Sequence, residues 1–291
     1  MRKIVTTAVT GIGALATSLV MAGIASASTG TAEISPEEAG YSTAGAQFQT
    51  VSASVFLRNP EQYATEVTGY GHSVQLWSSG LVMVLGVSDT TAAGSKAAGF
   101  SPAVAVFNRS THALLASSSN AAQIPAFWCP AGGTCQPATA GGSFAAGATV
   151  TERMHYNLST GMVGFRASDV AGNLFKATYA AGTGISFKQA RIGTEFGVTP
   201  WTAPAYTPPA NWTKIATYNN ARLVTYSGHV STLTSWWVHH QLLANTEAQS
   251  VAGDWVAIPT NLFNSGASFQ TFFVPTFAES PTGTAPQAPR A

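Results

Sequence analysis

Glu195 is the acid whose surroundings most call for a chemical explanation. It lies in the segment QARIGTEFGVTPW, residues 189–201, whose first part has the character of a strand. Only 9% of the chain is charged, and acids are depleted in strands and seldom buried without a partner. Glu195 therefore either has a partner and a task, or points to solvent. Arg191 and Arg166 are the candidate partners for a structural role.

The motifs of other hydrolytic chemistries are missing. Glycoside hydrolysis usually needs two carboxylates across one cleft, but the sequence has no E-x-D-x-E or E-x-E pattern and its acids are isolated: Glu152, Asp169, Glu195, Glu247 and Asp254. No G-x-S-x-G elbow for a serine nucleophile occurs. The histidines are scattered, and the adjacent His239 and His240 would face opposite sides of a strand. We therefore expect no metal site and no cofactor.

Tryptophans are the other resource for a site. Trp77, Trp201, Trp236 and Trp237 are candidate binding residues, because exposed rings on one sheet face can stack on sugars or pack against peptides. The alternative is ordinary packing in the core and at its rim. Trp236 and Trp237 are adjacent, so one of the two faces outward if both lie in a strand.

The first 27 residues have the pattern of a secretory signal peptide. Arg2 and Lys3 precede an apolar stretch of small residues, and Ala25-Ser26-Ala27 predicts cleavage after Ala27. We therefore expect a secreted, extracellular protein without a stable membrane anchor. Removal of these two positive charges takes the formal net charge from +1 to −1. A near-neutral chain gives no electrostatic reason to expect a nucleic-acid partner.

Two cysteines and the turn pattern complete the organisation. Cys129 and Cys135, in the run WCPAGGTC, predict a disulfide, because secreted proteins pair even numbers of closely spaced cysteines. Residues 28–278 are expected to form one β-sandwich domain. Residues 279–291, with three prolines, are expected to be a disordered tail.

The mature chain is predicted to consist almost entirely of short strands. Gly- and Pro-rich turns separate runs with alternating or continuous apolar character. This pattern of strands and turns predicts an all-β, two-sheet antiparallel sandwich. The expected strands are residues 48–57, 81–87, 103–107, 149–156, 162–167, 174–179, 189–196, 212–218, 222–227, 235–241, 254–258 and 269–274.

Several of these segments, taken in order, resemble the glutamic peptidase (eqolisin) family. Ala39-Gly40-Tyr41 and residues 45–57 resemble its N-terminal strands, residues 81–89 its next strand, and residues 150–169 its long hairpin. The sequence ARIGTEFG falls where that family carries its catalytic glutamate. The resemblance implies a concanavalin A-like jelly roll with a site on its concave face.

The resemblance also implies roles for two residues. In that family the glutamate is the general base on a water and a glutamine stabilises the oxyanion, so Glu195 takes the position of the acid. The glutamine is expected on the strand at residues 101–107, which contains none. Gln75, on a different predicted strand, can replace it only if it reaches the same face.

Because residues 101–107 contain no glutamine, our first hypothesis is a protein without peptidase activity. We expect a secreted β-sandwich protein without the family's catalysis, which binds an extracellular carbohydrate or peptide on its concave face. The first alternative is a glutamic-type acid endopeptidase that uses Glu195 and Gln75. The second is a secreted structural or surface protein without a small ligand.

Overall fold

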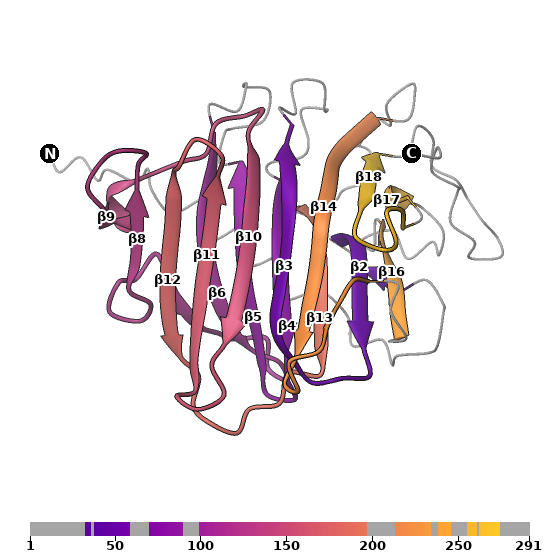
Figure 1. Cartoon of the computed structure of the whole chain (residues 1–291), viewed down its shortest axis with the longest axis horizontal. Coiled ribbons are helices and arrows are strands. Elements are labelled where there is room, and N and C mark those ends of the chain that lie inside the picture. Colours follow the sequence, from indigo (N-terminus) through magenta and orange to yellow (C-terminus); the bar gives the residue numbers. More distant parts are fainter. Residues whose placement is uncertain are drawn as a thin grey trace, which may run out of the picture.

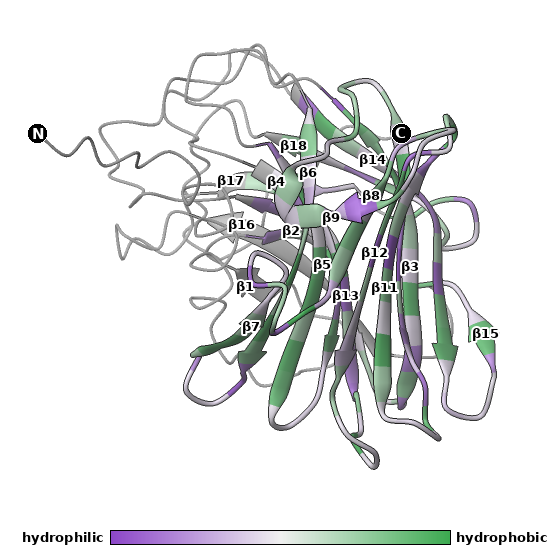
Figure 2. Ribbon diagram, turned by 90° about the vertical axis from the view of Figure 1, so that its left-hand side faces the viewer, coloured by the Kyte–Doolittle hydropathy of each residue, from purple (hydrophilic) through white to green (hydrophobic). Residues whose placement is uncertain are grey.

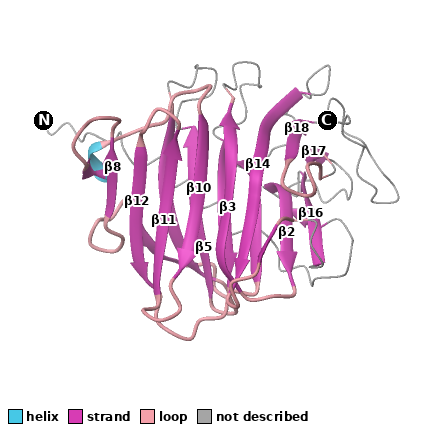
Figure 3. Cartoon of the chain, viewed as in Figure 1, coloured by secondary structure: helices cyan, strands magenta, loops and turns pink. Residues whose placement is uncertain are grey.

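A computed structural model describes residues 33–35, 38–58, 70–89, 99–196, 213–233, 238–245, 255–260 and 262–273. Almost all of these residues lie in strands or the turns between them (Figure 3). The predicted signal peptide and tail lie outside the described residues. In the part of the chain that is described, no helix is long and apolar enough to cross a membrane.

The strands form two stacked layers (Figure 1). The front layer runs through six strands in spatial order: β8 (Ala126–Cys129), β12 (Leu174–Ala180), β11 (Met162–Asp169), β10 (Thr149–Tyr156), β3 (Phe48–Leu57) and β14 (Thr213–Thr225). Each neighbouring pair is antiparallel. Short β9 (Gln136–Pro137) pairs with β8, and β15 (Val230–Ser231) pairs with β14.

The back layer holds seven strands. Their spatial order is β7 (Leu114–Ser117), β6 (Phe100–Asn108), β5 (Leu81–Asp89), β4 (Tyr70–Trp77), β13 (Gln189–Phe196), β2 (Glu38–Ala44) and β16 (Val238–Asn245). Two further strands, β17 (Trp255–Pro259) and β18 (Phe269–Phe273), link β16 to β14 and so connect the layers at one side. β1 (Glu33–Ser35) runs parallel to β16.

Alternation along each strand decides which side chains enter the core between the layers. On β3, Phe48, Val51 and Val55 are fully buried, and on β4 Val74 and Leu76 point inward. β5 is apolar on both faces and is buried along almost its whole length (Figure 2), which is typical of a central strand. The two layers therefore share one apolar core, with the outer face of each layer left for function.

The predicted fold class is confirmed: the protein is a two-sheet, antiparallel β-sandwich. The predicted disulfide is also present, between Cys129 and Cys135, and it is compatible with secretion. One boundary prediction was wrong. The segments 212–218 and 222–227 belong to one strand, β14, whose pairing with β3 shifts register between Asn219 and Arg222.

The core contains a small polar cluster. The Tyr218 hydroxyl lies 2.9 Å from Nδ1 of His72 and 2.9 Å from Oγ1 of Thr194, and Thr194 also contacts Thr271 at 3.0 Å. Burial lowers the pKa of His72 to about 3, so its ring is neutral. These hydrogen bonds satisfy polar groups that burial would otherwise penalise.

Glu152 is an acid whose side chain faces into the core between the layers. It lies on β10 between Val150 and Met154 and is fully buried. Neither carboxyl oxygen has a hydrogen-bond partner of normal geometry among the described residues. Burial raises the pKa of Glu152 well above its usual value, the charge of Glu195 raises it further, and the backbone at Val87 offsets only part of this. Burial therefore favours the protonated form of Glu152 in the folded protein.

We predict that Glu152→Met stabilises the protein at alkaline pH. Because the pKa of Glu152 is raised in the folded state, its ionisation costs no stability below the unfolded-state pKa. As pH rises above that value, the free energy of unfolding falls. Methionine has a similar volume and no proton to lose. Urea denaturation should show a gain of about 1–3 kcal/mol at pH 8 and a smaller gain at pH 4. An equal effect at both pH values would contradict the raised pKa of Glu152.

Candidate functional site

Polar side chains converge on the outer face of the back layer, where β13 lies between β4 and β2. Alternation on β4 turns Ser73, Gln75 and Trp77 outward, and alternation on β13 does the same for Arg191 and Glu195. In the register of the two strands, Gln75 pairs with Arg191 and Ser73 pairs with Gly193. Gln75 and Glu195 therefore approach each other across the row that holds Ser73 and Gly193.

The missing side chain of Gly193 makes this approach possible. A Cβ atom at Gly193 would lie 2.9 Å from the Ala39 carbonyl oxygen and 3.0 Å from Oε1 of Glu38. Gly40, which pairs with Gly193, is still more constrained, because its Cβ would lie 2.2 Å from the Ile192 carbonyl oxygen. Larger residues at Gly193 and Gly40 would push β13 and β2 apart and would fill space next to the Glu38 side chain.

Gln75 and Glu195 are directly hydrogen-bonded. Nε2 of Gln75 donates to Oε1 of Glu195 at 2.6 Å, and the indole Nε1 of Trp77 donates to Oε1 of Gln75 at 2.6 Å. An indole nitrogen is only a donor, so it must face the amide oxygen. Trp77 thereby fixes the amide orientation and points the N–H groups of Gln75 toward Glu195.

Glu195 combines burial with neutral hydrogen-bond donors. Its side chain is 4% exposed, and the Ser73 hydroxyl also donates to Oε1. Oε2 has no hydrogen-bond partner among the described residues. Burial raises the pKa of Glu195 to about 7, although the hydrogen bonds from Ser73 and Gln75 and the charge of Arg191 oppose this rise. The carboxyl can therefore exchange a proton near neutral pH.

A buried ion pair supports this arrangement from the side. Arg191 contacts Oε2 of Glu38 at 3.3 Å, and its guanidinium stacks over the Trp77 ring, 4.2 Å from the centroid. Oε1 of Glu38 lies 3.4 Å from Nε2 of Gln75. Glu38, Arg191 and Trp77 thus form a frame around the Gln75 amide.

Beside the polar cluster lies an apolar patch on the same outer face. Trp77 packs there with four side chains of β5 and β6: Val82, Val84, Ala105 and Phe107. All are buried. The patch holds the Trp77 ring in place and lowers the local dielectric, which strengthens the polar contacts next to it.

The structure places the predicted site residues unevenly. Gln75 and Glu195 are brought together, but on β4 and β13, and the strand at 101–107 in which the glutamine was expected belongs to β6, two strands away from β4. Trp77 is buried and hydrogen-bonded, so it offers no exposed stacking surface. Trp201, Trp236 and Trp237 lie outside the described residues.

The expected structural partners of Glu195 are only half right. Arg191 influences Glu195 through its charge but forms its ion pair with Glu38. Arg166 lies on β11 of the other layer, where it pairs in register with Arg153 and Lys176. Sequence reasoning missed Glu38 and Ser73. The one available signal was that Glu38 directly precedes Ala39-Gly40-Tyr41, the segment on which the family resemblance drew.

No group of three or more His, Cys, Asp or Glu side chains in the described ranges is placed to hold a metal ion. The polar cluster has two carboxyl groups, Glu38 and Glu195, with an amide and a cation between and beside them. Such groups can exchange a proton and can donate hydrogen bonds to an anion.

No protein-family profile and no curated protein matches the sequence. Among solved structures, the fold is similar to Scytalido-glutamic peptidase with a peptide-based transition-state analogue, with 10% identity over 82% of this chain and 98% of that one and a TM-score of 0.49. It is also similar to SCP-B, an eqolisin solved with the tripeptide Ala-Ile-His (9% identity, 82% and 98% coverage, TM-score 0.47). A weaker likeness is to peanut lectin (10% identity, 55% and 73% coverage, TM-score 0.22). The chain thus has a distant likeness in fold to the eqolisin peptidases.

Proposed function

We propose that the chain is a secreted peptide hydrolase of the glutamic-peptidase type, with Glu195 as general base and Gln75 as the oxyanion donor. The observation that carries the proposal is the 2.6 Å hydrogen bond between Nε2 of Gln75 and Oε1 of Glu195. A carboxylate next to a fixed neutral donor is the arrangement that water activation and oxyanion stabilisation require.

The proposed reaction uses one carboxyl group twice. The Glu195 carboxylate removes a proton from a water molecule as the water oxygen bonds to the peptide carbonyl carbon. The carbonyl oxygen becomes an oxyanion and accepts a hydrogen bond from the Gln75 amide. Glu195 then gives the proton to the amide nitrogen of the substrate, and the carbon–nitrogen bond breaks to release an amine and a carboxylic acid.

Gln75 can change partners at little cost. Its Nε2 carries two N–H donors, and besides the short bond to Glu195 it makes only long contacts, 3.2 Å to Ser73 and 3.4 Å to Glu38. An oxyanion would replace these weak contacts with a charge-assisted bond. Because Trp77 holds the amide oxygen, the donor stays oriented while this happens.

Glycoside hydrolysis is a poorer fit to the same groups. It needs an acid and a base on opposite sides of a sugar, and Glu38 is the second carboxyl group of the cluster. Nε2 of Gln75 is within 3.4 Å of a carboxyl oxygen of both Glu38 and Glu195. The amide therefore occupies the space in which a glycosidic bond would have to lie.

A non-catalytic binding role is the rival. Its main ground was the absence of a glutamine on residues 101–107, and Gln75 now supplies an amide from another strand. Gln75 and Glu195 are 1% and 4% exposed, so neither side chain is open to a ligand in this conformation. Under the binding hypothesis, neither the parent chain nor variants at these residues would hydrolyse a substrate. The substitutions would be detectable only through a change in ligand affinity.

The pH dependence of peptide hydrolysis tests the proposal. We predict that kcat/KM for an unfolded protein substrate rises with pH and levels off above about 7, because the base form of Glu195 dominates only there. Glu195→Gln should lower kcat by roughly 10²–10⁴-fold, and Gln75→Ala by roughly 10²–10³-fold. Release of new amino termini between pH 3 and 9 measures both. No hydrolysis anywhere in this range would favour the binding hypothesis.

Glu195→Gln should lower the activity, but it should raise the stability of the fold relative to the parent chain as pH increases. The folded-state pKa is raised from 4.5 to about 7, so the stability is fully present below pH 4.5 and is lost as pH rises through 7. Glutamine keeps the acceptor for Ser73 and Gln75 but does not ionise. The variant's stability relative to the parent should therefore increase by about 3 kcal/mol between pH 4 and pH 8. Urea denaturation at both pH values measures it, and a constant difference would contradict the raised pKa.

Trp77→Phe tests whether the orientation of Gln75 matters. The variant keeps an aromatic ring under Arg191 but loses the donor that fixes the amide, so the oxyanion donor is aimed correctly only part of the time. We expect kcat to fall by roughly tenfold with little change in KM, since the donor acts in the transition state. Steady-state kinetics would measure both constants. A rise in KM alone would show that Trp77 binds substrate and does not orient Gln75.

A further inference from the structure

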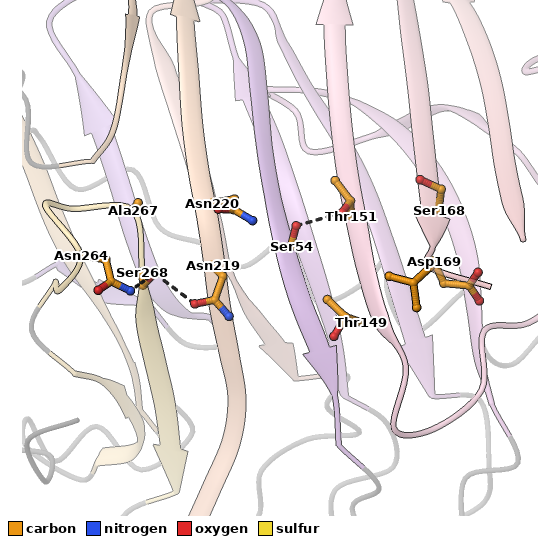
Figure 4. Close-up of a pocket in the computed structure, with 11 residues that line it drawn as sticks. Ser54, Thr149, Thr151, Ser168, Asp169, Asn219, Asn220, Asn264, Ala267 and Ser268 are labelled. Atoms are coloured by element: carbon orange, nitrogen blue, oxygen red, sulfur yellow. Dashed lines mark hydrogen bonds between the residues drawn. The ribbon is translucent and has the colours of Figure 1, made fainter. Parts of the chain in front are cut away.

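A polar groove of about 620 Å³ crosses the outer face of the front layer, which is the layer that does not contain Glu195. Its floor comes from β11, β10, β3 and β14, and one wall comes from the turn before β18 (Figure 4). The lining side chains are Ser54, Thr149, Thr151, Ser168, Asp169, Val170, Asn219, Asn220, Asn264, Ala267 and Ser268. Hydroxyls and amides dominate this set.

The backbone of the groove is unusual at its asparagines. Asn220 and Asn264 have φ angles of 53° and 50°, in the left-handed region, which asparagine adopts more readily than most other residues that carry a side chain. Asn220 also lies where the pairing of β14 with β3 shifts register, and bulges of this kind re-aim side chains. The left-handed backbone and the register shift thus decide where these two amides point.

The amides present donors and acceptors in fixed directions. Oδ1 of Asn219 accepts a hydrogen bond from the Ser268 hydroxyl at 3.1 Å, and Nδ2 of Asn264 donates to the same hydroxyl at 3.0 Å. Among the described residues, the donors of Asn219 and the side-chain acceptor of Asn264 have no further partner and can serve a ligand. Figure 4 shows the amide nitrogen of Asn220 directed toward Ser54 on β3. Ser54 and Thr151 bond to each other at 2.8 Å and keep further acceptor capacity.

The lining carries almost no available charge. Among the described residues that line it there is no Lys or Arg, and Asp169 is the single carboxylate. Both oxygens of Asp169 already accept hydrogen bonds from Asn173, at 2.9 and 2.7 Å. Phosphate, sulfate and nucleic acid would find no counter-charge here.

An exposed aromatic ring borders the groove. Phe56 is 38% exposed and lies two residues from Ser54 on the same face of β3, directly opposite Thr149 in the register with β10. A large apolar ring left in solvent beside a row of hydroxyls and amides offers a flat surface for an apolar ligand face. The groove thus combines polar edges with one stacking platform.

We propose that this groove binds a neutral oligosaccharide, with the Asn219, Asn220 and Asn264 amides on the sugar hydroxyls and one sugar ring stacked on Phe56. A pyranose has hydroxyls that both donate and accept and a C–H face that is apolar, and the groove offers a partner for each. A peptide would instead need backbone partners, and the floor strands already use theirs in the ladders with their neighbours. The site is separate from the proposed catalytic cluster.

The test is calorimetric titration of the full chain carrying Glu195→Gln with cellopentaose, xylopentaose, maltopentaose and chitopentaose. We expect at least one to bind, and Asn219→Ala and Phe56→Ala each to weaken it by about tenfold. Phe127→Ala is the matched control, because Phe127 is 40% exposed on β8 and does not line the groove. It should change the affinity less than about twofold.

Asn220→Gly separates binding from folding. Glycine accepts the left-handed backbone without strain, so the thermal unfolding midpoint should hold or rise while the affinity falls. The proposal is overturned if none of the four sugars binds at about 10 mM, if Phe127→Ala weakens binding as much as Phe56→Ala, or if inorganic sulfate binds in their place. Groove variants made in the parent chain should leave peptide hydrolysis unchanged, so this proposal and the catalytic one can fail separately.

Discussion

Desolvation of carboxyl groups is the constraint around which this sandwich is organised. The chain has only 12 acids, yet Glu38, Glu152 and Glu195 are among those that are buried in or on the same two layers. Each is accommodated differently. Glu38 is paired with Arg191, Glu152 lies in an apolar core where burial raises its pKa, and Glu195 accepts hydrogen bonds from two neutral donors. Burial raises the pKa of Glu195 to about 7, so this carboxyl can gain and lose a proton near neutral pH, which is why chemistry is expected there.

Much of the architecture could be predicted from the sequence, because two-residue alternation decides which face of a strand is buried. The assembly of the site could not. Gln75 and Glu195 are 120 residues apart, and chain order gives no indication that β4 lies beside β13. The error at β14 has a similar origin: Asn219-Asn220 is a typical turn signal, but here it forms a register shift inside one long strand. Alternation is local information, whereas strand pairing depends on the whole fold.

The two outer faces of the sandwich differ in kind. The back layer buries its polar groups next to Trp77 and an apolar patch, which strengthens each charge and hydrogen bond. The front layer leaves hydroxyls and amides open to solvent in a groove, where single contacts are weak and several must add up. A protein that holds a glycan on one face and cuts peptides on the other would keep its catalytic group close to a polysaccharide-rich surface.

The way β13 is paired has a consequence for how the molecule folds. Its neighbours β2 and β4 come from the beginning of the chain, and the Arg191–Glu38 contact closes a loop of 153 residues. Such non-local pairings raise the contact order and slow folding. During synthesis, Glu38 and Gln75 are made long before Arg191 and Glu195 emerge. A nascent or partly folded chain therefore carries Glu38 and Gln75 without Arg191 and Glu195, and the complete polar cluster exists only once the back layer has closed.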